Sequence, residues 1–311
     1  MIKESIYRFT SAYRGEFEVS AYKFNKGEKS CCIVGALRGS EIQQLYVCSK
    51  LIRELKELEK QCRISYNHEI TVIPCVNPFS MNIGRKYWCS DNRDINRDFP
   101  GSSDGEPTQR IASALLNFVK EYRYGIQFPS FYIQGDFIPH VRMMETGRES
   151  VSLAGLFGLP YVALRKPQPS EESTLNYNWQ MSGTGAFSVY ARETESIDEE
   201  GANMAVAAVL RFLSRMGIIK YQCHGGYMST VFDEDSLMPV KSTAGGIFHS
   251  LKKPGDEVIQ GEIMAEILHP YENTVLGEVK APCNGIVFFA HKSPLVCENT
   301  VVYKVIKRLR S

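Results

Sequence analysis

The chain has 311 residues, of which 43% are hydrophobic and 23% are charged, and its formal net charge is +1. This is the composition of a globular protein, so it excludes intrinsic disorder, collagen-like repeats and long coiled coils. A near-neutral chain also has no overall positive field that would draw it onto nucleic acid or an anionic membrane. Only six residues are histidine.

The sequence contains no signal that would direct the chain out of the cytoplasm. Its first ten residues, MIKESIYRFT, contain no apolar stretch typical of a signal peptide. No segment reaches the roughly 18 apolar residues that a membrane-spanning helix needs. The nine cysteines are odd in number and have no CxxC spacing, which favours free thiols. We therefore expect a cytoplasmic protein with neither membrane nor nucleic-acid partners, and its oligomeric state is not indicated.

Strand-like and helix-like segments alternate along the first two thirds of the chain. Apolar or β-branched runs predict strands at 29–36, 69–76, 125–133, 161–164 and 186–191. Apolar residues at three- and four-residue spacing predict helices at 42–58, 106–122, 150–157 and 199–216, with loops at 80–105 and 165–180. Ser40 is expected to cap the first helix. This alternation predicts a three-layer α/β domain over residues 1–222, with a mixed, largely parallel sheet.

Residues 223–311 have no helical period and consist of short β-branched runs between Gly, Pro and Asn. The run 244–248 (AGGIF) is echoed by 283–288 (CNGIVF), which predicts two similar β-hairpin units in one all-β domain. This segment resembles the lipoyl/biotinyl barrel-sandwich fold. The segment between the two units, 268–273, reads LHPYEN and has no lysine to carry a cofactor. We therefore expect a lid or packing domain here.

Three segments of the α/β part resemble one protein family. They are 35–41 (GALRGSE), Asn77-Pro78 and 94–101 (DINRDFPG). The succinylglutamate desuccinylase/aspartoacylase family of zinc carboxypeptidase-like deacylases has the pattern G-x-H-G-x-E, N-P, D-x-N-R-x-F-P-G and a strand ending in D-L-H-S. The resemblance covers nearly the whole chain, and 94–101 is its most specific part. It implies a zinc-carboxypeptidase-like domain with an appended β domain.

The resemblance also implies an activity, hydrolysis of the amide bond in an N-acyl amino acid or a similar small carboxylate. In the family, two histidines and a glutamate hold one zinc ion, which lowers the pKa of its water and polarises the amide carbonyl. Glu41 stands at the position of the zinc glutamate. Asn96 and Arg97 match the pair that binds a substrate carboxylate, which suits a planar guanidinium.

Further site residues follow from the resemblance. Arg85 lies in the loop where the family has an arginine that steadies the carbonyl oxygen. Glu193, after the 186–191 strand, fits the later catalytic glutamate that acts as general base, and Glu195 is the alternative for that role. The site is expected beyond the carboxyl ends of the central strands.

The two histidine ligands of the family are missing from this sequence. Arg38 occupies the first position, and Pro129 (or Phe128, in another alignment) occupies the second. An arginine stays protonated and offers no lone pair to zinc, and proline has no side-chain ligand atom. An ion pair between Arg38 and Glu41 is therefore favoured over a rebuilt metal site. The cofactor is zinc by resemblance, or none.

Other residues keep two interpretations. His140 is expected at the pocket as a polar wall or ligand contact, and Arg38 as a further ligand contact. Arg97 could instead pair with Asp94 or Asp98, and Asp94 is expected to cap the loop. Two functions stay open: an amide hydrolase with a degenerate metal site, and a catalytically inactive relative that binds a small carboxylate.

Overall fold

The computed structural model describes residues 1–11, 14–131 and 134–308. These residues form two compact units. The α/β unit contains residues 1–130 and 140–231, and the β unit contains residues 131–139 and 232–311. Among the described residues, no helix is both long enough and apolar enough to cross a membrane.

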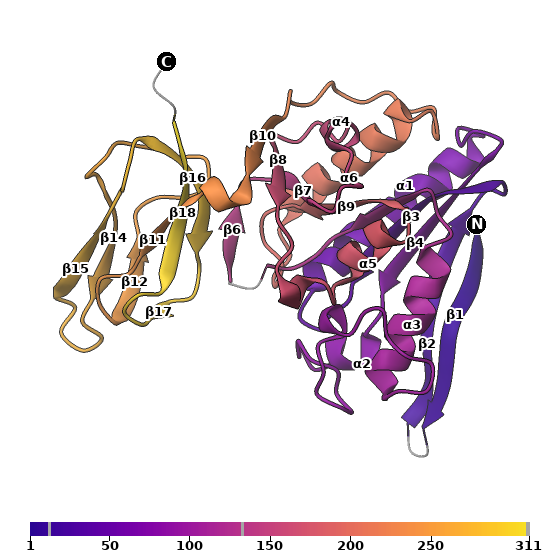
Figure 1. Ribbon diagram of the computed structural model, residues 1–311, viewed down its shortest axis with the longest axis horizontal. Coiled ribbons are helices and arrows are strands. Elements are labelled where there is room, and N and C mark those ends of the chain that lie inside the picture. The colour runs from indigo at the N-terminus through magenta and orange to yellow at the C-terminus, as the bar shows by residue number, and fades with distance from the viewer. Residues whose placement is uncertain (12–13, 132–133, 309–311) are drawn as a thin grey trace. The chain divides into compact units, whose positions relative to one another are not determined.

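Nine strands of the described chain form one mixed sheet in the order β1-β2-β4-β3-β5-β9-β7-β8-β10 (Figure 1). The strands are β1 (Ile2–Ser11), β2 (Arg14–Phe24), β3 (Glu28–Ala36), β4 (His68–Cys75), β5 (Tyr124–Gln127), β7 (His140–Met144), β8 (Tyr161–Arg165), β9 (Gly185–Tyr190) and β10 (Thr230–Asp233). The centre, β4-β3-β5-β9, is parallel throughout. Such strands are covered on both faces, which explains why β3 reads as a continuous apolar run.

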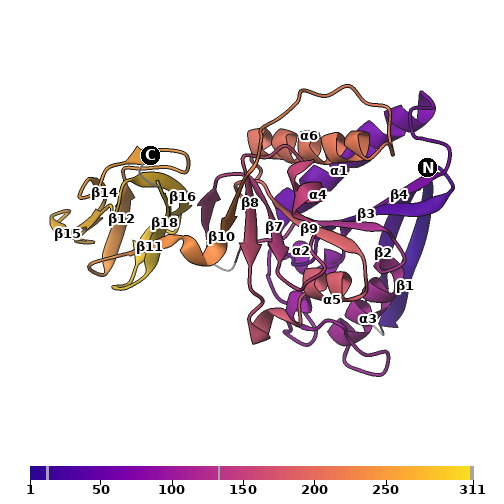
Figure 2. The ribbon, with the colours of Figure 1, turned by 45° about the horizontal axis from the view of Figure 1, so that its top comes forward.

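Helices cover both faces of this sheet (Figure 2). The helical segments are α1 (Ile42–Lys60), α2 (Pro78–Met81), α3 (Pro107–Val119), α4 (Val151–Gly155), α5 (Leu175–Met181) and α6 (Glu199–Arg215), with the 3-10 turns η1 (Ile95–Arg97) and η2 (Pro169–Glu171). Successive side chains of β3 point to opposite faces. Ile33 therefore belongs to the same core cluster as Val47 of α1 and Phe212 of α6, whereas Val34 belongs to the cluster that contains Leu115 of α3 and Trp179 of α5.

The fold class predicted from the sequence is confirmed, three local predictions are wrong, and one element was missed. The segment 165–180 is not a loop, because it contains η2 and α5. The strand expected over 125–133 ends at Gln127, and residues 132 and 133 lie outside the described chain. Glu41 stands at the N-cap position of α1 in place of Ser40, and its side chain makes no capping bond. The β1–β2 hairpin was not predicted.

The β unit consists of two antiparallel sheets. One has the order β11-β18-β16-β13, with β6 paired to β16, and the other has the order β15-β14-β12-β17. Its elements are β6 (Gly135–Phe137), η3 (Glu234–Ser236), β11 (Met238–Lys241), β12 (Gly246–Ser250), β13 (Glu257–Val258), β14 (Ile263–Leu268), β15 (Val275–Lys280), β16 (Gly285–His291), β17 (Leu295–Val296) and β18 (Val301–Lys307). Strand β6 comes from the middle of the chain, because the β unit includes residues 131–139. The division into domains 1–222 and 223–311 stays a prediction made from the sequence.

Candidate active site

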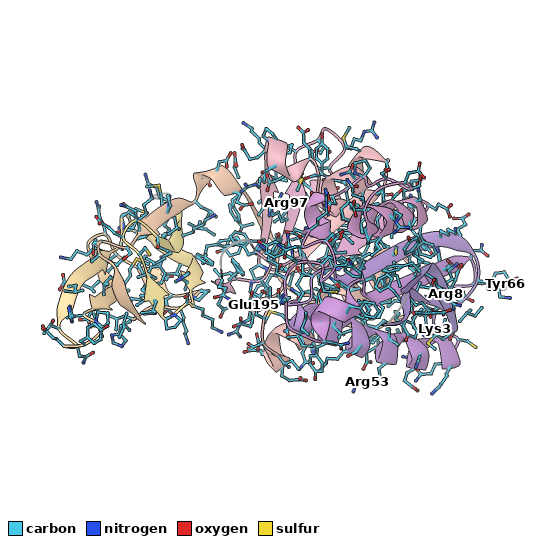
Figure 3. All side chains as sticks on the ribbon, turned by 90° about the horizontal axis from the view of Figure 1, so that it is seen from below. Lys3, Arg8, Arg53, Tyr66, Arg97 and Glu195 are labelled. Atoms are coloured by element: carbon cyan, nitrogen blue, oxygen red, sulfur yellow. The ribbon has the colours of Figure 1, made fainter. Side chains whose placement is uncertain are left out.

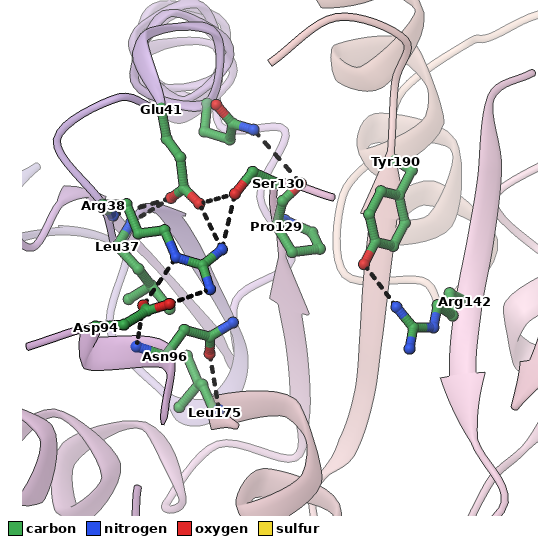
Figure 4. Close-up of polar contacts among 11 residues, drawn as sticks. Leu37, Arg38, Glu41, Asp94, Asn96, Pro129, Ser130, Arg142, Leu175 and Tyr190 are labelled. Atoms are coloured by element: carbon green, nitrogen blue, oxygen red, sulfur yellow. Dashed lines mark hydrogen bonds and ion pairs between the residues drawn. The ribbon is translucent and has the colours of Figure 1, made fainter. Parts of the chain in front are cut away.

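Polar residues from three separate segments meet at one edge of the parallel sheet (Figure 4). Arg38 follows β3, and Ser130 follows β5, which is paired with β3 in parallel. Asp94 comes from the long loop between α2 and α3. Because the carboxyl ends of parallel strands lie at the same edge, this is where an open α/β sheet places its ligand sites.

The Glu41 carboxylate is buried, with 1% of the residue exposed. Its Oε2 atom accepts hydrogen bonds from the backbone N–H groups of Leu37 at 2.8 Å and of Arg38 at 3.0 Å. Its Oε1 atom accepts a hydrogen bond from the Ser130 hydroxyl and faces Nη1 of Arg38 at 3.4 Å. Glu41 therefore turns back over the β3–α1 turn and is fully supplied with donors, which is why it does not cap its own helix.

The Arg38 guanidinium contacts Asp94, Ser130 and Glu41. Nε and Nη2 donate to the two carboxylate oxygens of Asp94, each at 2.8 Å, and Nη1 donates to the Ser130 hydroxyl at 2.8 Å. Burial by itself would lower the pKa of Arg38, but the charges of Glu41 and Asp94 outweigh it and raise the pKa above its ordinary value. The ion pair of Arg38 with Glu41 that the sequence favours is present, and Asp94 is the better-aligned partner.

Asp94 links Arg38 to the residues expected to bind a carboxylate. Its Oδ1 atom also accepts from the backbone N–H of Asn96 at 3.1 Å, so it caps η1 as expected. Asn96 is buried, and its Oδ1 atom accepts from the backbone N–H of Leu175 at the start of α5, at 3.1 Å. The Asn96 turn is thus held on one side by the Arg38–Asp94 pair and on the other by α5.

Arg97 and Arg85 are exposed. Arg97, labelled in Figure 3, donates to the carbonyl oxygen of Ser170. Neither carboxylate considered from the sequence pairs with it, because Asp94 binds Arg38 and Asp98 binds Arg93. Arg97 therefore stays exposed to solvent beside the buried Asn96.

The two late glutamates follow β9. Glu193 is half-buried and lines a narrow pocket with Gln43, Thr194 and Val189, beside α1. Glu195 is exposed and is labelled in Figure 3. Val189 belongs to the core cluster on the face of the sheet that α1 covers, and Glu193 lines the same pocket as Val189.

His140 lies at the start of β7 in a second buried polar cluster. Only 1% of it is exposed, and its ring stacks on that of Tyr190 with centroids 4.8 Å apart. Arg142 donates to the Tyr190 hydroxyl at 3.0 Å and to Glu171 Oε1 at 2.8 Å. Burial alone would raise the pKa of Glu171, but the backbone N–H of Gln168 and the charges of Arg142 and Arg165 lower it.

Sequence reasoning did not single out Ser130, Tyr190 or Arg142. Ser130 could have been found only from its place just after a buried strand. Arg142 alternates along β7 with the core residues Val141 and Met143, which marks it as facing the opposite side of the sheet. Trp179 is buried, and its Nε1 donates to the Val119 carbonyl oxygen at 2.9 Å.

The residues around Glu41 do not suit a zinc ion. Zinc binds lone pairs of Cys, His, Asp or Glu, and the structure has no group of three such residues that could hold a metal within its described parts. A protonated guanidinium stands against Glu41 and has no lone pair to give. His68 begins β4 and lies beside Ser30, and His140 stacks on Tyr190.

Residues 28–216 match the family model described as the succinylglutamate desuccinylase/aspartoacylase catalytic domain. Over 283 residues the chain is 22% identical to the N-alpha-acetyl-L-2,4-diaminobutyric acid deacetylase of Halomonas elongata, covering 82% of this chain and 75% of that protein.

Two solved structures show the same fold over almost the whole chain. The succinylglutamate desuccinylase/aspartoacylase of Rhodobacter sphaeroides superposes with a TM-score of 0.80 and 20% identity, covering 99% of this chain and 96% of that one. The product-bound ectoine utilization protein EutE (DoeB) of Ruegeria pomeroyi has a TM-score of 0.77 and 18% identity, covering 94% and 89%. Because the family model spans more than half of the sequence, the chain belongs to the succinylglutamate desuccinylase/aspartoacylase family.

Proposed function

We propose that this protein is a hydrolase that acts on the amide bond of an N-acyl amino acid or a similar small carboxylate. The observation that carries this proposal is the match of residues 28–216 to the catalytic domain of the family. A relative named as an N-acetyl amino acid deacetylase supports the same class of substrate. The polar cluster at the carboxyl ends of β3 and β5 supports the position of the site.

Asn96 and Arg97 are proposed to receive the substrate carboxylate. Asn96 is fixed between Asp94 and α5, and Arg97 next to it presents an exposed guanidinium. Two parallel N–H···O bonds from a guanidinium match the two oxygens of a carboxylate. Arg85 is proposed to steady the carbonyl oxygen, while His140 and Arg38 belong to the wall of the site.

Glu193 is proposed as the general base that activates water, with Glu195 as the alternative. A positioned carboxylate can take a proton from water and later return it to the leaving amine. The family's zinc would sit at Glu41, where Arg38 stands in this chain. We therefore propose that the metal site is degenerate and that hydrolysis does not depend on a metal at Glu41.

A second candidate function is binding of the same small carboxylate without hydrolysis. One observation favours it. The carboxylates of Glu41 and Asp94, which both contact Arg38, already accept hydrogen bonds from protein donors, so neither is poised to act on a substrate. In that case Asn96 and Arg97 would hold the ligand, and no bond would be cleaved.

One experiment separates the two candidates. The purified protein is incubated with N-acetyl and N-succinyl L-amino acids that carry acidic, basic and neutral side chains. Release of the free amine is followed by chromatography, and binding by calorimetry. Amine release that either Glu193→Gln or Glu195→Gln lowers by about 100-fold or more supports the hydrolase, and the variant that loses activity identifies the general base. Binding without amine release supports the second candidate, and neither binding nor release contradicts both.

A further inference from the structure

Two acidic side chains, the buried Glu41 and the partly buried Asp94, both contact the Arg38 guanidinium. Glu41 is 1% exposed, and the Asp94 side chain is 12% exposed. Removing carboxylates from water is costly unless an opposite charge and hydrogen bonds compensate them. Arg38, itself 5% exposed, contacts both of them.

The contacts of Arg38 join three segments that are distant in the chain. All three guanidinium nitrogens take part: Nε and Nη2 bind Asp94, and Nη1 binds both Ser130 and Glu41. Glu41 belongs to the β3–α1 turn, Asp94 lies 56 positions after Arg38, and Ser130 lies 92 positions after it. A metal ion bound here would also neutralise the carboxylates of Glu41 and Asp94, and it would also link these segments.

The acidic partners are themselves fixed in orientation. Glu41 is held by the N–H groups of Leu37 and Arg38, and Asp94 by the N–H of Asn96. Such outer donors are what orient carboxylates around a bound ion. Backbone donors thus fix both carboxylates in orientation, and the cation that they face is the Arg38 side chain.

We propose that Arg38 replaces a divalent metal as the fixed cation of this site. An arginine keeps its proton at every physiological pH, so the charge is permanent and needs no metal supply. The wild-type protein is then indifferent to zinc and to chelators. It also follows that the Arg38–Asp94 pair holds the turn with Asn96 and Arg97 in place.

One substitution should convert this site into a zinc-binding site. Arg38→His removes the guanidinium and introduces an imidazole beside Glu41 and Asp94. One imidazole nitrogen and two carboxylates are a donor set that zinc accepts. Zinc should therefore bind this variant, and because a ligand specific for the folded state stabilises it, zinc should also raise its melting temperature.

The experiment titrates zinc into the wild type, Arg38→His and the double variant Arg38→His/Glu41→Gln, with calorimetry and melting temperature as readouts. The expected result is about one zinc per chain in Arg38→His only, with a rise of several degrees in its melting temperature. Loss of this binding in the double variant assigns the zinc to Glu41. Arg38→Lys, which keeps the charge, serves as a second variant and is expected to fold and to bind no zinc.

Two results would overturn the proposal. One is stoichiometric zinc binding by the wild type that Glu41→Gln abolishes, because a metal would then share the site with Arg38. The other is a folded Arg38→His variant that binds no zinc. Neither readout involves a substrate, so the outcome is independent of the proposed hydrolase activity.

Discussion

The guanidinium of Arg38 and the carboxylate of Asp94 meet in two parallel hydrogen bonds of 2.8 Å, although 56 positions separate them in the chain. This pair lies at the carboxyl edge of the sheet, next to Glu41 and Ser130 (Figure 4). It brings the β3–α1 turn and the loop with Asn96 and Arg97 together. The site is therefore organised around a cation that the chain itself supplies.

Loss of that cation should destabilise the fold. Arg38→Met leaves the buried Glu41 and the partly buried Asp94 without this counter-charge, and breaking a buried pair costs about 3–5 kcal/mol. Urea unfolding followed by circular dichroism measures the effect. Arg53→Met is the matched control, because Arg53 is an exposed arginine of α1 that should change the free energy of unfolding by less than ~0.5 kcal/mol. Equal stability of the wild type and Arg38→Met would contradict the role of Arg38.

The coupling between Arg38 and Asp94 can be measured directly. Asp94→Asn keeps an oxygen that can accept from Asn96 but removes the charge that Arg38 faces. In a double-mutant cycle, Arg38→Met and Asp94→Asn together should cost less than the sum of the single effects, by roughly 1–3 kcal/mol. Strict additivity would show that the two residues do not interact in solution.

Glu171 should make the free energy of unfolding depend on pH in the acidic range. Because its pKa is lowered in the folded chain, it stabilises the fold above its unfolded pKa of about 4.3. This contribution is lost as the pH falls through the folded pKa. The stability difference between the wild type and Glu171→Gln should therefore be largest near neutral pH and shrink below about pH 4.

The control for this prediction is Glu172→Gln, at the exposed neighbouring position. It should leave the free energy of unfolding unchanged within ~0.5 kcal/mol across the same pH range. If the difference between wild type and Glu171→Gln did not vary with pH, the proposed charge interactions of Glu171 with Arg142 and Arg165 would be wrong.

Arg97→Ala tests the carboxylate-binding pair. Arg97 is exposed and donates to the Ser170 carbonyl, so its loss should barely change stability. A hydrogen bond to a charged group contributes about 1.5–3 kcal/mol, so affinity for an N-acyl amino acid should fall by roughly 10- to 100-fold. Arg8→Ala, at an exposed arginine of β1, is the control for calorimetry. Unchanged affinity in Arg97→Ala would remove Arg97 from the site.

Much of the fold was predictable because its strands and helices carry regular apolar patterns. The continuous apolar run of β3 and the three- and four-residue spacing of α1 are examples. The β2 strand also had a signal, since Phe17, Val19 and Ala21 alternate with polar residues and are buried. Helix α5 had no clear pattern, because its burial depends on Leu175 and Trp179 packing onto distant parts of the core.

The site was predictable where its partners are close in sequence. Arg38 and Glu41 are three positions apart at a strand-to-helix turn, so their ion pair could be foreseen. The approach of Asp94 to Arg38 depends on how the 82–106 loop folds, which no local pattern encodes. The stacking of His140 on Tyr190 depends on the antiparallel register of β7 with β9.

The metal content of the wild-type protein tests the central claim most directly. The chain is produced in zinc-supplemented medium, purified without chelator and measured by inductively coupled plasma mass spectrometry. With Arg38 as the cation of the site, zinc should be well below one ion per chain and the same as in Glu41→Gln. One tightly held zinc per chain that disappears in Glu41→Gln would contradict the account.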